Sequence, residues 1–389
     1  MIEFFKPGLY WDFMGHVRGL LGVSIALVVL SIVSIVTLGF NFGIDFAGGY
    51  EIQIKLPKAA TEAEIKEQLS TLDIEKARVQ RFGDQSGIEY LILVREHGTL
   101  KEADSEQIKK DFEALAGGSD HITNWSVSES GEILRVGFAQ PISEEAVRNV
   151  ITARELKLKN IHKSDRVDSP EYTIELVSLG GQIANAIVAG LGLPKDTDIL
   201  SKVEFVGPQV GSQLRNQGIM AVIYSLIFIL LYTAIRFDFY FAPGAIVCIV
   251  HDVIVTLGFL SVLQIEFTLA TVAGLLTLVG YSINDTIVIF DRIRENLTRL
   301  RGRELRHLVS TSISDTLSRT ILTSVSVLLV VVALLIFSGR ALADFSMVLL
   351  VGTIVGTYSS MSVAAPCYVF MRERYGKRDK PKANPASAT

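Results

Sequence analysis

The sequence predicts an integral membrane protein, built as an α-helical bundle of six transmembrane helices with an external α+β domain of ferredoxin-like topology. Two observations lead to this fold class. Hydrophobic residues make up 49% of the 389 residues, and they gather in separate runs rather than spreading evenly. One long polar segment, 41–218, separates the first run from the second.

Six apolar runs qualify as membrane spans. A helix needs about 20 apolar residues to cross a hydrocarbon core of about 30 Å, and a buried helix of a soluble protein would show one polar face. Most of these runs show no such face. The first run lacks a small-residue cleavage site, so we interpret it as an uncleaved anchor. The predicted spans are 20–40, 219–235, 241–263, 267–290, 320–337 and 345–371.

Basic residues in the short connections predict the orientation, because cytoplasmic loops carry an excess of Lys and Arg. The connection 291–318 holds a cluster of arginines, and the tail 372–389 holds a second basic cluster. The two short connections on the opposite side hold only Arg340. The N-terminal segment 1–19 and the tail are therefore predicted to be cytoplasmic, and the polar segment 41–218 periplasmic.

Composition narrows the function classes. The formal net charge of −4 does not favour a nucleic-acid partner. Cys248 and Cys367 lie inside predicted spans, which excludes a disulfide framework. The sequence has no P-loop, no H-E-x-x-H, no Cys/His metal cluster and no nucleophile elbow. We therefore predict no enzymatic activity, no metal and no bound cofactor.

The polar segment begins with the pattern of a ferredoxin-like unit. Period-2 alternation predicts strands and period-3.6 patterning predicts helices. The resulting order is βαββαβ, which is the ferredoxin-like motif. The strands are predicted at 50–56, 76–82, 88–95 and 121–128, and the helices at 61–72 and 104–116.

A repeat of this pattern follows. Adding 82 to the residue number carries Ile54 onto Val136 and Tyr90 onto Tyr172. We therefore predict two tandem βαββαβ units; chance is the alternative, because such patterns recur in any α+β domain. Open sheet faces or edges offer an extended polypeptide a place for strand addition, unless they pack on each other or on a partner. The predicted units are about 50–128 and 132–206.

Two polar residues interrupt the fourth span. The stretch 280–296, GYSINDTIVIFDRIREN, places Asn284 and Asp285 in an otherwise apolar helix. A carboxylate at the centre of such a helix costs about 2.5–3.5 kcal/mol, so it faces the bundle interior or a wet cavity. Burial favours the protonated carboxyl and a nearby cation favours the ionised one. Asp285 is therefore a candidate proton carrier, and Asn284 beside it is a candidate member of the same proton relay. The plainer interpretation of both residues is a hydrogen bond to a neighbouring helix.

Arg319, at the start of the fifth span, supplies a cation. Its long side chain can reach inward from the interface, and a cytoplasmic hairpin permits the fourth and fifth helices to be neighbours. We expect Asp285 to be ionised when Arg319 is close and protonated when it is away. One proton that crosses the membrane releases about 2.3 kcal/mol per 100 mV, which is enough to bias a conformational equilibrium.

His251 and Asp252 form a second polar pair, inside the third span. Histidine titrates near neutrality, so these two residues could extend a proton relay. Adjacent residues of a helix point about 100° apart and are not expected to face each other. A structural hydrogen bond is the equal alternative.

Glycines mark both ends of the polar segment. Gly48 and Gly49 let the chain turn tightly from membrane into strand, and Gly207, Pro208 and Gly211 do the same on the way back. We interpret these residues as hinges or junctions rather than as a binding site. Such a junction is well placed to transmit membrane motion to the external domain.

With these motifs the chain resembles the SecF family of protein-export membrane subunits. The stretch 280–296 is the most specific part of the resemblance, and the middle of the external domain does not share it. The other matching patches are GIDFAGG at 43–49, VGPQVGSQL at 206–214, SRTILTS at 318–324 and FSMVLLVGTIVGTYSS at 345–360.

The resemblance implies kinship with resistance-nodulation-division transporters and a multi-pass protein among the lipids of the bacterial inner membrane. It implies pairing with SecD, and proton-driven help to a secreted preprotein that emerges from the SecYEG channel. The family's proton-carrying aspartate and arginine fall on Asp285 and Arg319. The chain departs from the family in size, because SecF usually has one shorter external domain, and it lacks a SecD half.

Two other functions stay open at this point. Transporters of this superfamily could move a lipid or a small molecule outward, which a roomy apolar cavity in the external domain would favour. A passive scaffold that holds the translocon together is the other. Replacing Asp285 by Asn and testing co-purification with SecD and SecYEG separate these functions.

Overall fold

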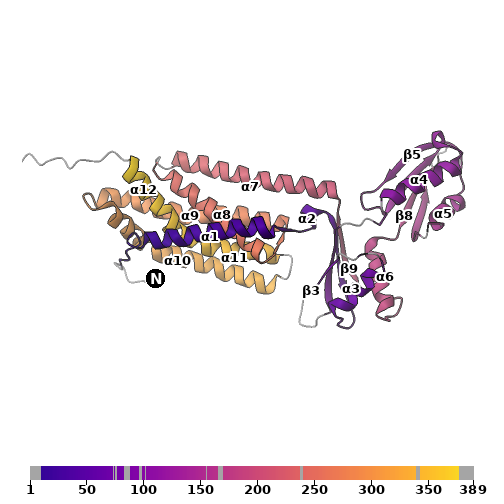
Figure 1. The fold of residues 1–389 in the computed structure, drawn as a ribbon, viewed down its shortest axis with the longest axis horizontal. Coiled ribbons are helices and arrows are strands. Elements are labelled where there is room, and N and C mark those ends of the chain that lie inside the picture. The colour runs from indigo at the N-terminus through magenta and orange to yellow at the C-terminus, as the bar shows by residue number, and fades with distance from the viewer. Residues whose placement is uncertain are drawn as a thin grey trace, which may run out of the picture. The chain divides into compact units, whose positions relative to one another are not determined.

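The computed structural model of the chain divides into two compact units (Figure 1). One, here called the helical unit, comprises Met1–Phe42 and Gln217–Thr389; the other, called the α+β unit, comprises Gly43–Asn216. Expectations for the extreme termini, 1–9 and 376–389, lie outside the described residues. The structure describes residues 10–72, 74, 77–82, 88–95, 99–100, 102–154, 156–164, 170–236, 240–338 and 342–375.

The prediction of six spans is confirmed. Among the described residues, six helical stretches are long and apolar enough to cross a membrane. They are α1 (Val17–Leu38), α7 (Pro208–Arg236), α8 (Ala242–Val262), α9 (Leu269–Arg299), α10 (Leu305–Phe337) and a last stretch, Ala343–Tyr375. That last stretch consists of α11 (Ala343–Ser359), a π-helical segment (Ser360–Ala364) and α12 (Ala365–Tyr375).

The connection predicted at 291–318 is mostly helical, so that prediction is wrong. Helix α9 continues to Arg299 and α10 already begins at Leu305. Hydropathy marks only the apolar part of a helix, whereas here polar contacts join the two helices beyond it. The Arg292 guanidinium lies 2.7 Å from Asp315 of α10, and the Asn296 amide donates to Ser312 Oγ at 2.9 Å.

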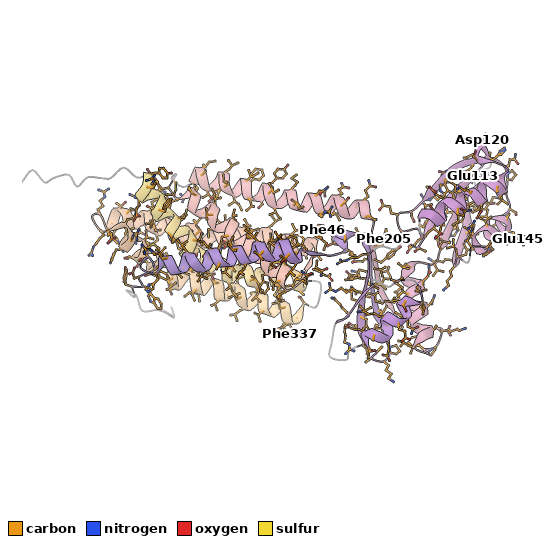
Figure 2. The ribbon with its side chains drawn as sticks, viewed as in Figure 1. Phe46, Glu113, Asp120, Glu145, Phe205 and Phe337 are labelled. Atoms are coloured by element: carbon orange, nitrogen blue, oxygen red, sulfur yellow. The ribbon has the colours of Figure 1, made fainter. Side chains whose placement is uncertain are left out.

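A short parallel strand pair and contacts between helices complete the helical unit. Strand β1 (Asn41–Phe42), which follows α1, pairs in parallel with β10 (Glu266–Phe267), which precedes α9. Helix α8 packs against α1, α9 and α11, and α9 also packs against α10 and α11. Phe337, at the end of α10, is an exposed apolar side chain (Figure 2).

The α+β unit contains two four-stranded antiparallel sheets. The first sheet has the strand order β3-β4-β2-β9, which is the ferredoxin-like order. The second has the order β5-β6-β8-β7, which is the same spatial arrangement with its first strand in the chain, β5, at the edge position that the last strand, β9, takes in the first sheet. The first sheet is built from α2 (Ile44–Ala47), β2 (Gly49–Lys55), α3 (Glu62–Ser70), β3 (Arg78–Phe82), β4 (Glu89–Val94), α6 (Leu179–Gly190) and β9 (Leu200–Val206). The second is built from α4 (Glu102–Ala116), β5 (Ile122–Val127), β6 (Ile133–Phe138), α5 (Glu144–Thr152), β7 (Leu158–Lys163) and β8 (Glu171–Leu176).

The prediction of two tandem units is wrong in how it divides the chain. Strand β9 pairs with β2, with Val203 opposite Ile52, and β5 pairs with β6, with Trp125 opposite Val136. The second sheet and its two helices, from α4 to β8, are therefore nested between β4 and α6. We call them the nested module, and the remaining elements of the α+β unit the host module. Glu113 on α4 and Glu145 on α5 mark the nested module's helices (Figure 2).

The internal repeat nevertheless extends to individual side chains. The Tyr90 hydroxyl donates to the Ala60 carbonyl at 2.5 Å, and the Tyr172 hydroxyl donates to the Ile142 carbonyl at 2.5 Å. The Ala60 carbonyl lies just before α3 and the Ile142 carbonyl just before α5, the helices that follow β2 and β6. A cation also lies over each tyrosine ring. Arg81 lies 5.7 Å from the Tyr90 ring centroid, and Lys163 lies 5.9 Å from the Tyr172 ring centroid.

Candidate functional site

Asp285 lies in the interior of the helical unit. Helix α9 carries it, and the residue is only 2% exposed. Its Oδ2 atom is buried and has no hydrogen-bond partner. A carboxylate oxygen that is buried without a partner is costly, so such a group favours binding a proton or approaching a cation.

Arg319 supplies a charge that acts on Asp285. It lies on α10, which packs against α9, and its guanidinium interacts electrostatically with the Asp285 carboxyl. Within the described part of the chain, no direct ion pair joins the two side chains. Arg319 is exposed at the surface of the bundle. The Arg319 guanidinium and the Asp285 carboxyl therefore interact electrostatically without forming a direct ion pair.

Asn284 does not join this pair. It follows the same helix but is exposed, whereas Asp285 is buried, because consecutive helical residues point about 100° apart. The structure thus brings Asp285 and Arg319 into range and leaves Asn284 on the outer face of α9.

His251 and Asp252 face each other, contrary to the prediction. His251 Nδ1 lies 2.9 Å from Asp252 Oδ1, and the two side chains are 5% and 1% exposed. The other carboxylate oxygen of Asp252 accepts a hydrogen bond from Ser282 Oγ of α9. The Ser282 side chain thereby connects the third span to the helix that carries Asp285.

Sequence inspection missed the rest of this cluster. Cys248 Sγ lies 3.1 Å from Ser359 Oγ at the end of α11 and 3.7 Å from Thr286 Oγ1 of α9. The chain then continues through the π-helical segment Ser360–Ala364, a local widening that occurs frequently at functional sites. Ser282 lies one helical turn before Asp285, and this spacing is a signal in the sequence that places the two residues on the same face of α9. Nothing in the sequence pattern marks the π-helical segment.

Gly356 of α11 provides the room for this cluster. A Cβ atom at this position would lie 3.2 Å from Ser282 Cβ and 3.5 Å from Asp252 Oδ2. The GxxxG pair formed with Gly352 therefore lets α11 approach α9 and α8 closely.

We expect Gly356→Val to destabilise the helical unit by about 1–3 kcal/mol, because the three added carbons overpack the site. Thermal unfolding of the full chain in lipid nanodiscs measures the effect. Gly280→Val is the matched control, since a Cβ atom at Gly280 of α9 meets nothing within 4 Å. Equal losses of stability in the two variants would contradict this role for Gly356.

The five predicted junction residues lie together in the α+β unit. Gly48 and Gly49 have φ values of +75° and +123°, which other residues rarely adopt. A Cβ atom at Gly48 would lie 3.0 Å from Pro208 Cα, and one at Gly211 would lie 3.0 Å from Gly48 N. Pro208 is the first residue of α7, where its missing N–H costs nothing. Gly207 immediately precedes it, so the start of β2 and the start of α7 are packed backbone to backbone.

Tyr50 connects this junction to the nested module. Its hydroxyl donates to the Ser130 carbonyl at 3.0 Å and lies 3.2 Å from a Glu132 carboxylate oxygen. Burial raises the pKa of the Tyr50 phenol, so the group stays a neutral donor. Its ring packs on Phe205 of β9, with the centroids 4.6 Å apart.

Two family models match the chain. The model of the protein export membrane protein SecD/SecF C-terminal region covers residues 193–374, and the model of the SecD/SecF GG motif covers residues 33–59. Together they span more than half of the 389 residues. The chain belongs to the SecD/SecF family. The GG motif includes Gly48 and Gly49, whereas the nested module falls in the stretch that neither model matches.

Curated relatives extend the match to the full length. The chain is 31% identical over 378 residues to the protein translocase subunit SecF of Rickettsia prowazekii, covering 97% of this chain and 96% of the relative. It is 34% identical over 388 residues to the protein translocase subunit SecF of Magnetococcus marinus, covering 100% of both. The predicted resemblance to the family is therefore confirmed.

A solved structure has the same fold over most of the chain. The crystal structure of SecDF, a translocon-associated membrane protein from Thermus thermophilus, matches with a TM-score of 0.62 and 29% identity. The match covers 94% of this chain and 39% of that one. This chain thus spans well under half the length of the solved protein, and it is a multi-pass membrane protein.

Proposed function

We propose that this chain acts as a SecF subunit that uses the proton motive force, together with SecD, to help secreted proteins cross the bacterial inner membrane. In this role both termini are cytoplasmic and the α+β unit is periplasmic. The partners are SecD, the SecYEG channel and the translocating preprotein. The proton gradient replaces a cofactor, and no enzymatic step is involved.

One observation carries the proposal: Asp285 is a buried carboxyl with an unpartnered oxygen, and the Arg319 charge acts on it without an ion pair. In the proposed cycle, approach of Arg319 favours the carboxylate and its withdrawal favours the protonated acid. Proton uptake from one side and release to the other then drive the conformational change. Each proton supplies about 2.3 kcal/mol per 100 mV of membrane potential.

The exposed polar residues support a partner in the membrane. Asn284 and Arg319 lie at the surface of an apolar bundle, and charged or polar groups facing lipid are costly. A second bundle that covers this face would supply their partners, and we assign that place to SecD. The solved relative SecDF, of which this chain matches 39%, is compatible with such a second half.

Reconstitution tests the proposal. SecYEG, SecD and this chain are placed in proteoliposomes, and the amount of a translocated preprotein protected from protease is measured with and without an imposed proton gradient. We expect the chain to stimulate translocation only when both the gradient and SecD are present. Stimulation that persists after a protonophore collapses the gradient would support the passive scaffold instead.

A further inference from the structure

A second titratable group in the helical unit takes no part in the proposed Asp285–Arg319 cycle. His251 is 5% exposed, its Nδ1 bonds Asp252 Oδ1 at 2.9 Å, and its Nε2 is buried without a hydrogen-bond partner. A satisfied structural histidine uses both ring nitrogens, so one unpartnered nitrogen at this depth needs an explanation.

The hydrogen-bond pattern fixes which nitrogen is available. Ser282 donates to one oxygen of Asp252 and His251 approaches the other. A carboxylate that accepts at both oxygens requires His251 to carry its hydrogen on Nδ1. The lone pair of the neutral ring is then on Nε2, which is the atom that can take up a proton.

The surroundings favour such uptake. Neutral His251 beside ionised Asp252 leaves one net negative charge buried between helices, and an imidazolium beside the same carboxylate leaves none. Low-dielectric surroundings penalise the uncompensated charge more than the pair. His251 also lines a cavity of about 290 Å³, whose other lining residues are Ser24 and aliphatic side chains of α1, α8 and the π-helical segment. None of these other lining residues is charged.

Few other titratable groups face the pair. Helix α8 itself contributes Cys248, and α9 contributes Asp285 one turn beyond Ser282. On α11, Tyr358 donates to the Leu20 carbonyl of α1, so it is occupied elsewhere. Tyr281 of α9 points to Ser324 of α10, and Tyr368 of α12 stacks on Phe241 at the start of α8. The α1 wall of the cavity carries no charge.

We propose that His251, held by Asp252, is a second proton-binding site of the helical unit, filled by addition of a proton to Nε2. The existence of this proton-binding site does not depend on the proposed function, but its role does. In that role the charge of the His251–Asp252 pair acts on Asp285 through Ser282, which lies on the same face of α9. The proton adds to the Nε2 lone pair, the Nδ1–H bond to Asp252 is retained, and the pair changes its net charge from −1 to zero.

Nitrogen NMR of isotope-labelled histidine tests the site directly. The full chain, assembled with SecD in nanodiscs, is titrated from about pH 5 to pH 8, where histidine changes charge. His251→Gln identifies the signal of this residue among the six histidines. We expect the His251 signal to change from that of a neutral ring with a bare Nε2 to that of an imidazolium as the pH falls. A His251 signal that stays in one state throughout would overturn the proposal.

Two variants separate a proton site from a structural pair. Asp252→Asn keeps the shape but removes the counter-ion, so we expect about ten-fold weaker proton binding at His251. Ser282→Ala leaves the counter-ion in place, so we expect a smaller change. Equal proton binding in Asp252→Asn and the unmodified chain would contradict the proposed pairing. Thermal unfolding of each variant reports whether the helical unit stays folded.

Asp285→Asn keeps the two proposals distinguishable. If this variant exports normally with the gradient while His251 still titrates, the proposed function fails and the proton site stands. If His251 stays in one state while Asp285→Asn abolishes gradient-driven export, the site fails and the proposed function stands.

Discussion

Asp285→Asn is expected to abolish the gradient-dependent part of export while leaving assembly with SecD intact. Asparagine is nearly isosteric but cannot exchange a proton, so the Arg319 charge no longer has a titrating partner. A drive of about 2.3 kcal/mol per 100 mV corresponds to a factor of about 50 in an equilibrium. Proteoliposome translocation with and without a gradient measures the loss, and co-purification measures assembly.

The matched control is Asp291→Asn. Asp291 lies on the same helix but is exposed near its polar end, so its carboxylate is already solvated or paired at low cost. We expect export by this variant to keep its full response to the gradient. Equal responses of Asp285→Asn and the unmodified chain would instead favour a scaffold.

Phe112→Ala is expected to destabilise the nested module by about 3–5 kcal/mol. Phe112 of α4 is fully buried in the core of the second sheet, with Val136 and Ile174. Hydrogen exchange of the full chain should therefore accelerate in β5, β6, β7 and β8, whereas β2 and β4 keep their protection.

The reciprocal variant is Ile187→Ala on α6, with an expected cost of about 2–5 kcal/mol. Ile187 is buried in the core of the first sheet, with Ile52 and Ile92. Exchange should accelerate in β2, β3, β4 and β9 only. The tandem division of the chain predicts the opposite pair of results, so acceleration in β2 and β4 of Phe112→Ala would refute the nested topology.

The strands and helices of the α+β unit could be predicted from periodicity, but their partners could not. A period of two places Ile52 and Val136 on buried faces without saying which strand lies alongside them. The two later helices bury the same kind of stripe, Ile108 with Phe112 in α4 and Ile183 with Ile187 in α6. Either helix would satisfy either sheet locally, so only the tertiary pairing decides.

The residues of the candidate site also divide into those that the sequence predicts and those that only the tertiary structure reveals. Hydropathy singled out Asp285 because a carboxyl in an apolar run is conspicuous, and the structure places it in the bundle interior. The contact between His251 and Asp252 depends on side-chain rotamers, and the contribution of Ser359 depends on how α11 meets α8. Neither follows from positions along a single helix. Serine and glycine are common in membrane helices, so Ser282 and Gly356 carry no signal alone.

The central claim is that Asp285 changes its protonation state during the cycle. Infrared difference spectroscopy of the complex with SecD in nanodiscs, with isotope-labelled aspartate, follows the C=O stretch of a protonated carboxyl as pH and gradient are varied. We predict a band that appears and disappears with these conditions and is missing in Asp285→Asn. A spectrum in which the Asp285 carboxyl keeps one protonation state under every condition would contradict the account.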